Sequence, residues 1–157
     1  MKLAVAEVIA TSFYSGYAPK APGTAGAVVG VVMVYLMHHF GGFGSYHIAG
    51  FVWLALWPSI WATDQLIDAL KLKDPQCVVV DEVLGQMVSF LGADLDSPWS
   101  YLVAFGLFRA FDIWKPFPVK WFEKLPRGYG VIFDDLAAGV YALGVMYALR
   151  NFLNLPL

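Results

Sequence analysis

The sequence predicts an all-α membrane protein, a polytopic helix bundle with four or five short membrane helices and an N-terminal interfacial helix. Composition is the first observation behind this fold class, since 59% of the 157 residues are hydrophobic and only 14% are charged. An average soluble domain carries about 25% charged residues. The second observation is that no Asp, Glu, Lys or Arg occurs from residue 25 to residue 63. This stretch matches two membrane helices of roughly 20 residues each, and the whole chain, 1–157, has the length of a single domain.

The chain begins with a segment that mixes apolar and polar positions. We expect this segment to form a short helix that lies in the membrane interface. The apolar residues that could line one face of this helix are Leu3, Ala6, Val8, Ile9 and Phe13. Pro19 and Pro22 are expected to break this helix, because proline interrupts the helical hydrogen-bond ladder.

Five apolar segments follow, at residues 25–37, 48–63, 78–93, 99–111 and 136–149. Turns and polar loops separate them, including a Pro-rich, basic and aromatic stretch at 112–127. Several segments are shorter than a full span, so we expect them to tilt, to extend into their charged edges or to cross only part of the bilayer.

Basic residues indicate the orientation, because cytoplasmic loops of membrane proteins carry an excess of Lys and Arg. With these segments as five spans, one side of the membrane carries nine basic residues and the other carries only Arg150. This bias places both acidic pairs described below, together with the 112–127 stretch, on the cytoplasmic face. For lysines such as Lys120 and Lys124, fixing the topology is a sufficient explanation.

Two adjacent acidic pairs, Asp81-Glu82 and Asp134-Asp135, lie at the edges of apolar segments. Carboxylates beside hydrocarbon are costly unless a cation compensates them. Packing the two helix edges together would bring both pairs into one site, where a divalent ion would remove their repulsion. Asp134 is expected at a helix N-terminus, so a plain capping role is its alternative.

Arg109, Asp112 and Lys115 are spaced by three residues and lie along one stripe of a helix. Arg109 interrupts an apolar run, which is costly unless its guanidinium meets an anion. The planar guanidinium suits a phosphate. An internal salt bridge from Arg109 to Asp112 or to an acidic pair explains the same spacing and stays open as an alternative.

Pro22-Gly23-Thr24 opens the first apolar segment. Backbone N–H groups at a helix start, with the Thr24 hydroxyl and Lys20 nearby, form a candidate anion site. Thr24 as a simple N-cap is the alternative. The net charge of −2 argues against a nucleic-acid partner, and the lone Cys77 excludes an intramolecular disulfide.

Several blocks of the sequence together resemble one known family. They are Pro22-Gly23-Thr24, Asp74-Pro75, VDEVLG at 80–85, FRAFDIWKPFP at 108–118 and GYGVIFDDLAAG at 128–139. Their order resembles that of the phosphatidylglycerophosphatase A family, from about residue 12 to about residue 149. The resemblance implies a Mg²⁺-dependent phosphatase of the bacterial inner membrane with its active site on the cytoplasmic face. Its substrate would be phosphatidylglycerophosphate, whose terminal phosphate is hydrolysed to give phosphatidylglycerol during phospholipid biosynthesis.

The resemblance also implies roles for individual residues. The implied ligands of one or two Mg²⁺ ions are the four paired carboxylates, Asp81, Glu82, Asp134 and Asp135. The implied phosphate-binding residues are Lys20, Gly23, Thr24, Arg109 and Lys115. Asp112 either completes the metal shell or orients the attacking water. Apolar helix faces would receive the acyl chains of a substrate that stays in the bilayer.

Two other classes of protein fit the charged residues without the resemblance. In a transporter the acids and Arg109 would form an ion pathway, and in a structural subunit they would form salt bridges between helices. Acids clustered at one membrane edge favour an enzyme over both. The oligomeric state is not indicated by any feature of the sequence.

Overall fold

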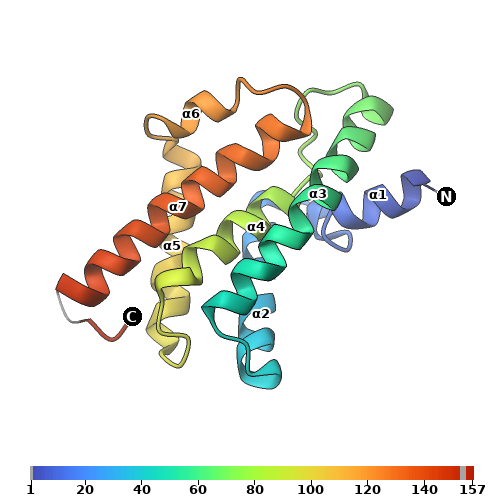
Figure 1. Ribbon diagram of the computed structural model, residues 1–157. Helices are drawn as coiled ribbons and strands as arrows, with labels where there is room; N and C mark the ends of the chain where they lie inside the picture. The colour runs from blue at the N-terminus through green and yellow to red at the C-terminus, as the bar shows by residue number, and fades with distance from the viewer. Residues whose placement is uncertain (1, 153–154) are drawn as a thin grey trace.

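The computed structural model describes residues 2–152 and 155–157, and within them every regular element is helical, so the all-α prediction is confirmed. The α-helices are α1 Lys2–Ala10, α2 Pro22–Gly41, α3 Ser45–Leu70, α4 Val80–Ser89, α5 Pro98–Trp114, α6 Val119–Phe122 and α7 Gly128–Phe152. Two short 3-10 turns, η1 Ser15–Tyr17 and η2 Phe90–Gly92, accompany them. The short helix α4 lies in the middle of the bundle, and the longer helices pass around it (Figure 1).

Helix α4 is the buried centre of the fold. All of its residues except Glu82 are buried, and it contacts α2, α3, α5 and α7. Ten residues of α-helix extend about 15 Å, half of a hydrocarbon core of about 30 Å. The predicted apolar segment 78–93 therefore forms a short helix enclosed by its neighbours, and its polar residues meet protein rather than lipid.

Two helices of the described chain, α2 and α7, are long and apolar enough to cross a membrane. Of the four or five membrane helices expected from the sequence, these two meet this test of length and composition. Large apolar side chains also point outward from α3, where Trp53, Leu54 and Trp57 are exposed. Extended apolar surfaces of this kind are typical of a protein in contact with lipid.

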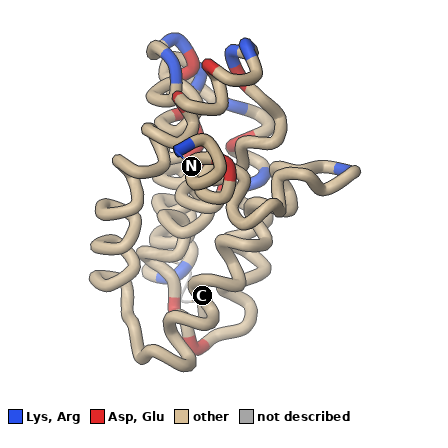
Figure 2. The backbone as a smooth tube through the Cα atoms, turned by 90° about the vertical axis from the view of Figure 1, so that its right-hand side faces the viewer, with Lys and Arg blue, Asp and Glu red and all other residues tan. Residues whose placement is uncertain are grey.

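Charged residues are unevenly distributed along the molecule. Most of them gather at one end in Figure 2, whereas the middle of the bundle is almost free of them. This asymmetry agrees with the uneven distribution of basic residues in the sequence.

Four helix boundaries differ from the prediction. Helix α1 ends at Ala10, before both prolines, and is followed by left-handed residues at 12–14. Pro22 begins α2 instead of breaking a helix, because the first helical position needs no N–H donor. The turn predicted between the apolar segments 25–37 and 48–63 is limited to residues 42–44, since α2 continues to Gly41 and α3 starts at Ser45.

The start of α7 corrects a further prediction. Helix α7 begins at Gly128, so Asp134 lies in its second turn and is not an N-cap. The cap comes from α3, where Asp64 Oδ1 accepts hydrogen bonds from the Gly128 N–H at 2.8 Å and from Arg127 Nε at 3.2 Å. A free N–H of the first turn is thereby satisfied by a residue distant in sequence, which no local pattern reveals.

Helices α4 and α7 cross at very short range through two glycines. A Cβ on Gly139 would overlap the carbonyl oxygen of Gly85, and a Cβ on Gly85 would lie 2.5 Å from the carbonyl oxygen of Asp135. Small residues allow two helix backbones to approach in this way. The contact places the acidic pair of α7 directly beside α4.

We predict that Gly139→Ala lowers the stability of the protein, because the added methyl group must push α7 away from α4. The expected loss is about 1–3 kcal/mol, the usual range for overpacking. Gly144→Ala is the matched control, since a Cβ there meets open space on the same helix and alanine favours helix by about 1 kcal/mol. Thermal unfolding in detergent, followed by circular dichroism, measures both. Equal melting temperatures for the two variants would contradict the tight crossing.

Candidate functional site

The first acidic pair lies in the first turn of α4. Asp81 is buried and Glu82 is partly buried. Asp81 Oδ1 accepts the backbone N–H of Glu82 at 3.0 Å, which holds the Asp81 carboxylate close to the helix start. Carboxylates are favoured at this end of a helix by its dipole.

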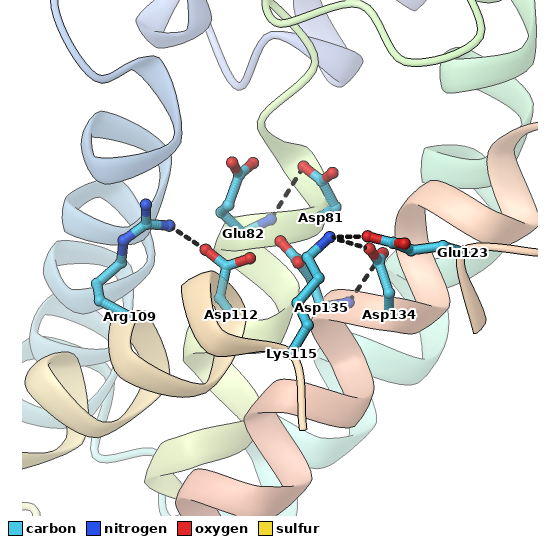
Figure 3. A network of polar contacts seen from close by, with 8 residues as sticks. All are labelled: Asp81, Glu82, Arg109, Asp112, Lys115, Glu123, Asp134 and Asp135. Atoms are coloured by element: carbon cyan, nitrogen blue, oxygen red, sulfur yellow. Dashed lines mark hydrogen bonds and ion pairs between the residues drawn. The ribbon is translucent and has the colours of Figure 1, made fainter. Parts of the chain in front are cut away.

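The second pair, on α7, meets the first through the α4–α7 crossing. One carboxylate oxygen each from Asp81, Glu82 and Asp135 lies within 4.8 Å of the others, and Figure 3 shows these side chains converging. The two acidic pairs therefore do come together in one site, although about 50 residues separate them in sequence.

Asp134 takes a different direction from Asp135. Its side chain accepts a hydrogen bond from Lys115 Nζ at 2.6 Å, and the same ammonium donates to Glu123 at 2.7 Å (Figure 3). Burial alone would lower the pKa of Lys115, but the two carboxylates outweigh burial and raise it above its usual value. Lys115 is therefore a fixed positive charge at neutral pH, and Asp134 is its buried partner.

Arg109 pairs with Asp112 one turn away on α5, Nη1 donating to Oδ2. The internal salt bridge that the spacing allowed is thus present. Both side chains nevertheless line the same cavity as the three clustered carboxylates. The guanidinium has five N–H donors, so pairing with Asp112 leaves donors for an anion in that cavity.

The cavity that joins these groups has a volume of about 310 Å³. Its charged lining residues are Asp74, Asp81, Glu82, Arg109, Asp112, Lys115, Asp134 and Asp135. Pro22, Gly23, Gln76, Val78 and Val131 complete the lining. Acids outnumber cations six to two, an excess that a divalent cation would reduce.

The candidate anion site at the start of α2 is divided by the structure. Gly23 faces the acids, and a Cβ there would collide with Glu82 Oε1 and lie 3.5 Å from Arg109 Nη1. Lys20 and Thr24 instead line a separate groove with Tyr14 and Tyr17. Gly23 is therefore part of the acidic cavity, whereas the role expected for Lys20 and Thr24 stays a prediction.

Sequence reasoning missed three polar residues of this region as members of the site. Asp74 and Gln76 reach the cavity from the loop between α3 and α4, and Asp74 was visible only as part of a short motif. Glu123 meets Lys115 from the end of α6. Because eight residues and two helix ends separate Glu123 from Lys115, no helical spacing could have indicated their contact.

The three clustered carboxylates fit a divalent cation. Their oxygens are close enough to share one ion, and oxygen ligands are those that Mg²⁺ prefers. Glu82 Oε2 is also buried without a hydrogen-bond partner among the described residues, so an acceptor is available there. Asp134 is bonded to Lys115 and stands outside this cluster of three.

Comparisons with known proteins agree with the blocks found in the sequence. The family model for phosphatidylglycerophosphatase A matches residues 8–150. The chain is 38% identical over 139 residues to a Bacteroides thetaiotaomicron protein named "Putative phosphatidylinositol-3-phosphatase", covering 86% of this chain and 87% of that protein.

Two further relatives carry the family's name. The phosphatidylglycerophosphatase A of Escherichia coli is 30% identical over 142 residues, covering 89% of this chain and 80% of the relative. That of Haemophilus influenzae is 32% identical over 148 residues, covering 93% and 89%. No solved structure matches the chain. With its acidic cavity and a family match across nearly its whole length, this chain belongs to the phosphatidylglycerophosphatase A family of lipid phosphatases.

Proposed function

We propose that the protein hydrolyses the terminal phosphomonoester of phosphatidylglycerophosphate at the cytoplasmic face of the bacterial inner membrane, with Mg²⁺ as cofactor. The observation that carries this proposal is the shared cavity, in which three clustered carboxylates lie together with Arg109 and Lys115. An ion-binding cluster beside two cations matches what phosphoryl transfer requires, which is positioning and neutralisation of charge.

Each residue of the cavity has a defined task in this mechanism. Asp81, Glu82 and Asp135 would hold the metal ion. When bound, such an ion lowers the pKa of a water molecule, so that the water can lose a proton and attack phosphorus. Arg109 and Lys115 bind the phosphoryl oxygens as negative charge moves toward the leaving group.

Asp112 and Asp134 act through these two cations. Asp112 holds the Arg109 guanidinium and Asp134 holds the Lys115 ammonium, so both cations are oriented before substrate arrives. Preorganised charges of this kind need little rearrangement during reaction. Asp112 is thereby a positioning residue for Arg109, and Asp134 is the same for Lys115.

A second candidate substrate is phosphatidylinositol 3-phosphate, because the Bacteroides relative carries the name of a phosphatase for that lipid. Both lipids present a phosphomonoester to the cavity, so its charged residues serve either one. An ion pathway is disfavoured, since the acids gather at one place where α4 and α7 cross and do not form a row along a span.

The deciding experiment is phosphate release by the detergent-purified protein from each lipid separately. We expect phosphatidylglycerophosphate to give the higher kcat/KM, EDTA to abolish release and Mg²⁺ to restore it, because the acids remain uncompensated without a cation. A higher kcat/KM for phosphatidylinositol 3-phosphate would reassign the substrate. Full activity in EDTA would exclude the metal mechanism, and no release from either lipid would exclude the phosphatase.

Asp81→Asn and Asp135→Asn should each reduce kcat on the order of a thousand-fold, the scale expected when a metal ligand is lost. Because both residues serve one ion, the double variant should be little worse than either single variant. Asp96→Asn is the control, since Asp96 is an exposed partner of His38 at the far end of α2. Fully additive losses in the double variant would show that the two carboxylates do not share a site.

The proposed orientation predicts which side of the membrane each end of the molecule faces. In a Cys77→Ala background, Lys124→Cys should react with a membrane-impermeant thiol reagent only from the cytoplasmic side, and Arg150→Cys only from outside. Both side chains are exposed on the protein surface. A cysteine that fails to react is therefore shielded from the reagent by the membrane and not by burial in the protein. Labelling of Lys124→Cys in intact cells would show that the topology is the reverse of the proposed one, with the active site on the outer face.

A further inference from the structure

The two ion pairs of Lys115 have very different surroundings. Asp134 belongs to the buried interior, with 7% of its side chain exposed, whereas 40% of the Glu123 side chain is exposed. Lys115 lines the acidic cavity together with Asp134, but Glu123 does not line it and reaches the ammonium from the end of α6. Lys115 is therefore bonded to the buried carboxylate of Asp134 on the cavity side and to the partly exposed carboxylate of Glu123 on the other side.

The Lys115 ammonium has three N–H donors, and two of them are used by Asp134 and Glu123. A phosphate group that takes more than one donor of Lys115 must therefore replace one of these carboxylates. Displacing Asp134 would leave a buried carboxylate without its partner, which is strongly unfavourable for a buried charge. Displacing Glu123 costs far less, since its carboxylate is already in contact with water. Of the two bonds of Lys115, the one to Glu123 is thus the bond that a phosphate oxygen can replace.

The balance of charge points the same way. The cavity already has six acids against two cations without counting Glu123. The Glu123 carboxylate at Lys115 adds to the negative potential that opposes a phosphate dianion, and it also occupies one of the three donors of the ammonium. Movement of Glu123 away from Lys115 removes both obstacles at once.

We propose that Glu123 is an internal competitor of the substrate, a carboxylate that occupies one donor of Lys115 until the phosphomonoester replaces it. This inference rests on the proposed function of the cavity and adds a residue that sets its affinity for phosphate. Glu123 touches Lys115 and does not contact the clustered carboxylates through any hydrogen bond among the described residues. It therefore tunes binding without taking part in the chemical step.

Removing the charge of Glu123 should tighten the binding of phosphate. For Glu123→Gln we expect KM for phosphatidylglycerophosphate and Ki for inorganic phosphate to fall about threefold to fivefold, the scale of a half-exposed ion pair. The value of kcat should not rise, because the chemistry is unchanged and product phosphate leaves more slowly. Glu123→Asp, which keeps the charge, should restore values close to wild type. A contact that only stabilised the fold would instead lower the melting temperature and leave KM and Ki unchanged or higher.

The matched control is Asp68→Asn. Asp68 is an exposed carboxylate 2.7 Å from Arg127 Nη2, so its replacement also removes one negative charge from an ion pair, but away from Lys115. Its KM and Ki should equal those of the wild type. An equal fall in both variants would show a general effect of net charge and would overturn the proposal, as would an unchanged or raised Ki in Glu123→Gln.

Direct binding of inorganic phosphate separates this inference from the proposed function. Stabilisation of the purified protein against heat by phosphate, with Mg²⁺ present, reports binding without turnover. Half-maximal stabilisation at a lower phosphate concentration in Glu123→Gln than in wild type supports the competitor even if neither lipid is hydrolysed. Hydrolysis by the wild type combined with unchanged phosphate binding in Glu123→Gln would retain the phosphatase and refute the role of Glu123.

Discussion

The close crossing of α4 and α7 at Gly85 and Gly139 is the constraint on which the site depends. The backbones approach so closely there that neither position has room for a Cβ. As a result Asp135 lies against the start of α4, where Asp81 and Glu82 occupy the first turn. A wider crossing would leave each acidic pair at the edge of its own helix, and the three carboxylates could not share an ion with ligand bonds of about 2.1 Å.

The acids of the cavity divide into two groups by their partners. Asp112 and Asp134 each hold a cation, whereas Asp81, Glu82 and Asp135 lie together and form no ion pair with any residue that the structure describes. On α7 the division follows from the direction in which each side chain leaves the helix, since neighbours on a helix point about 100° apart. Asp134 and Asp135 thus belong to different parts of the site although they are adjacent. The arrangement provides both positively charged groups for a phosphate and a place for the ion that accompanies it.

Much of the fold and part of the site could be predicted from local patterns. The helical segments and the stripe of Arg109, Asp112 and Lys115 follow from apolar periodicity and spacing. A shared site for the two acidic pairs was expected only from their place at helix edges on one side of the membrane. The start of α7 could not be predicted, because Asp64 of α3 caps it from another part of the chain. Glu123 was missed for the same reason, since a turn and a short helix bring it back to Lys115.

By itself, the sequence determined that the chain is helical, rich in apolar surface and equipped with paired carboxylates near basic residues. These properties depend on composition and on short-range spacing, which each segment carries independently of the others. The tertiary structure alone decided which carboxylates meet, which are neutralised and which side of α2 faces them. Gly23 faces the acids while Lys20 and Thr24 line another groove, because a side chain's neighbours across a helix interface are set by how the backbones pack, and that packing is a property of the whole bundle.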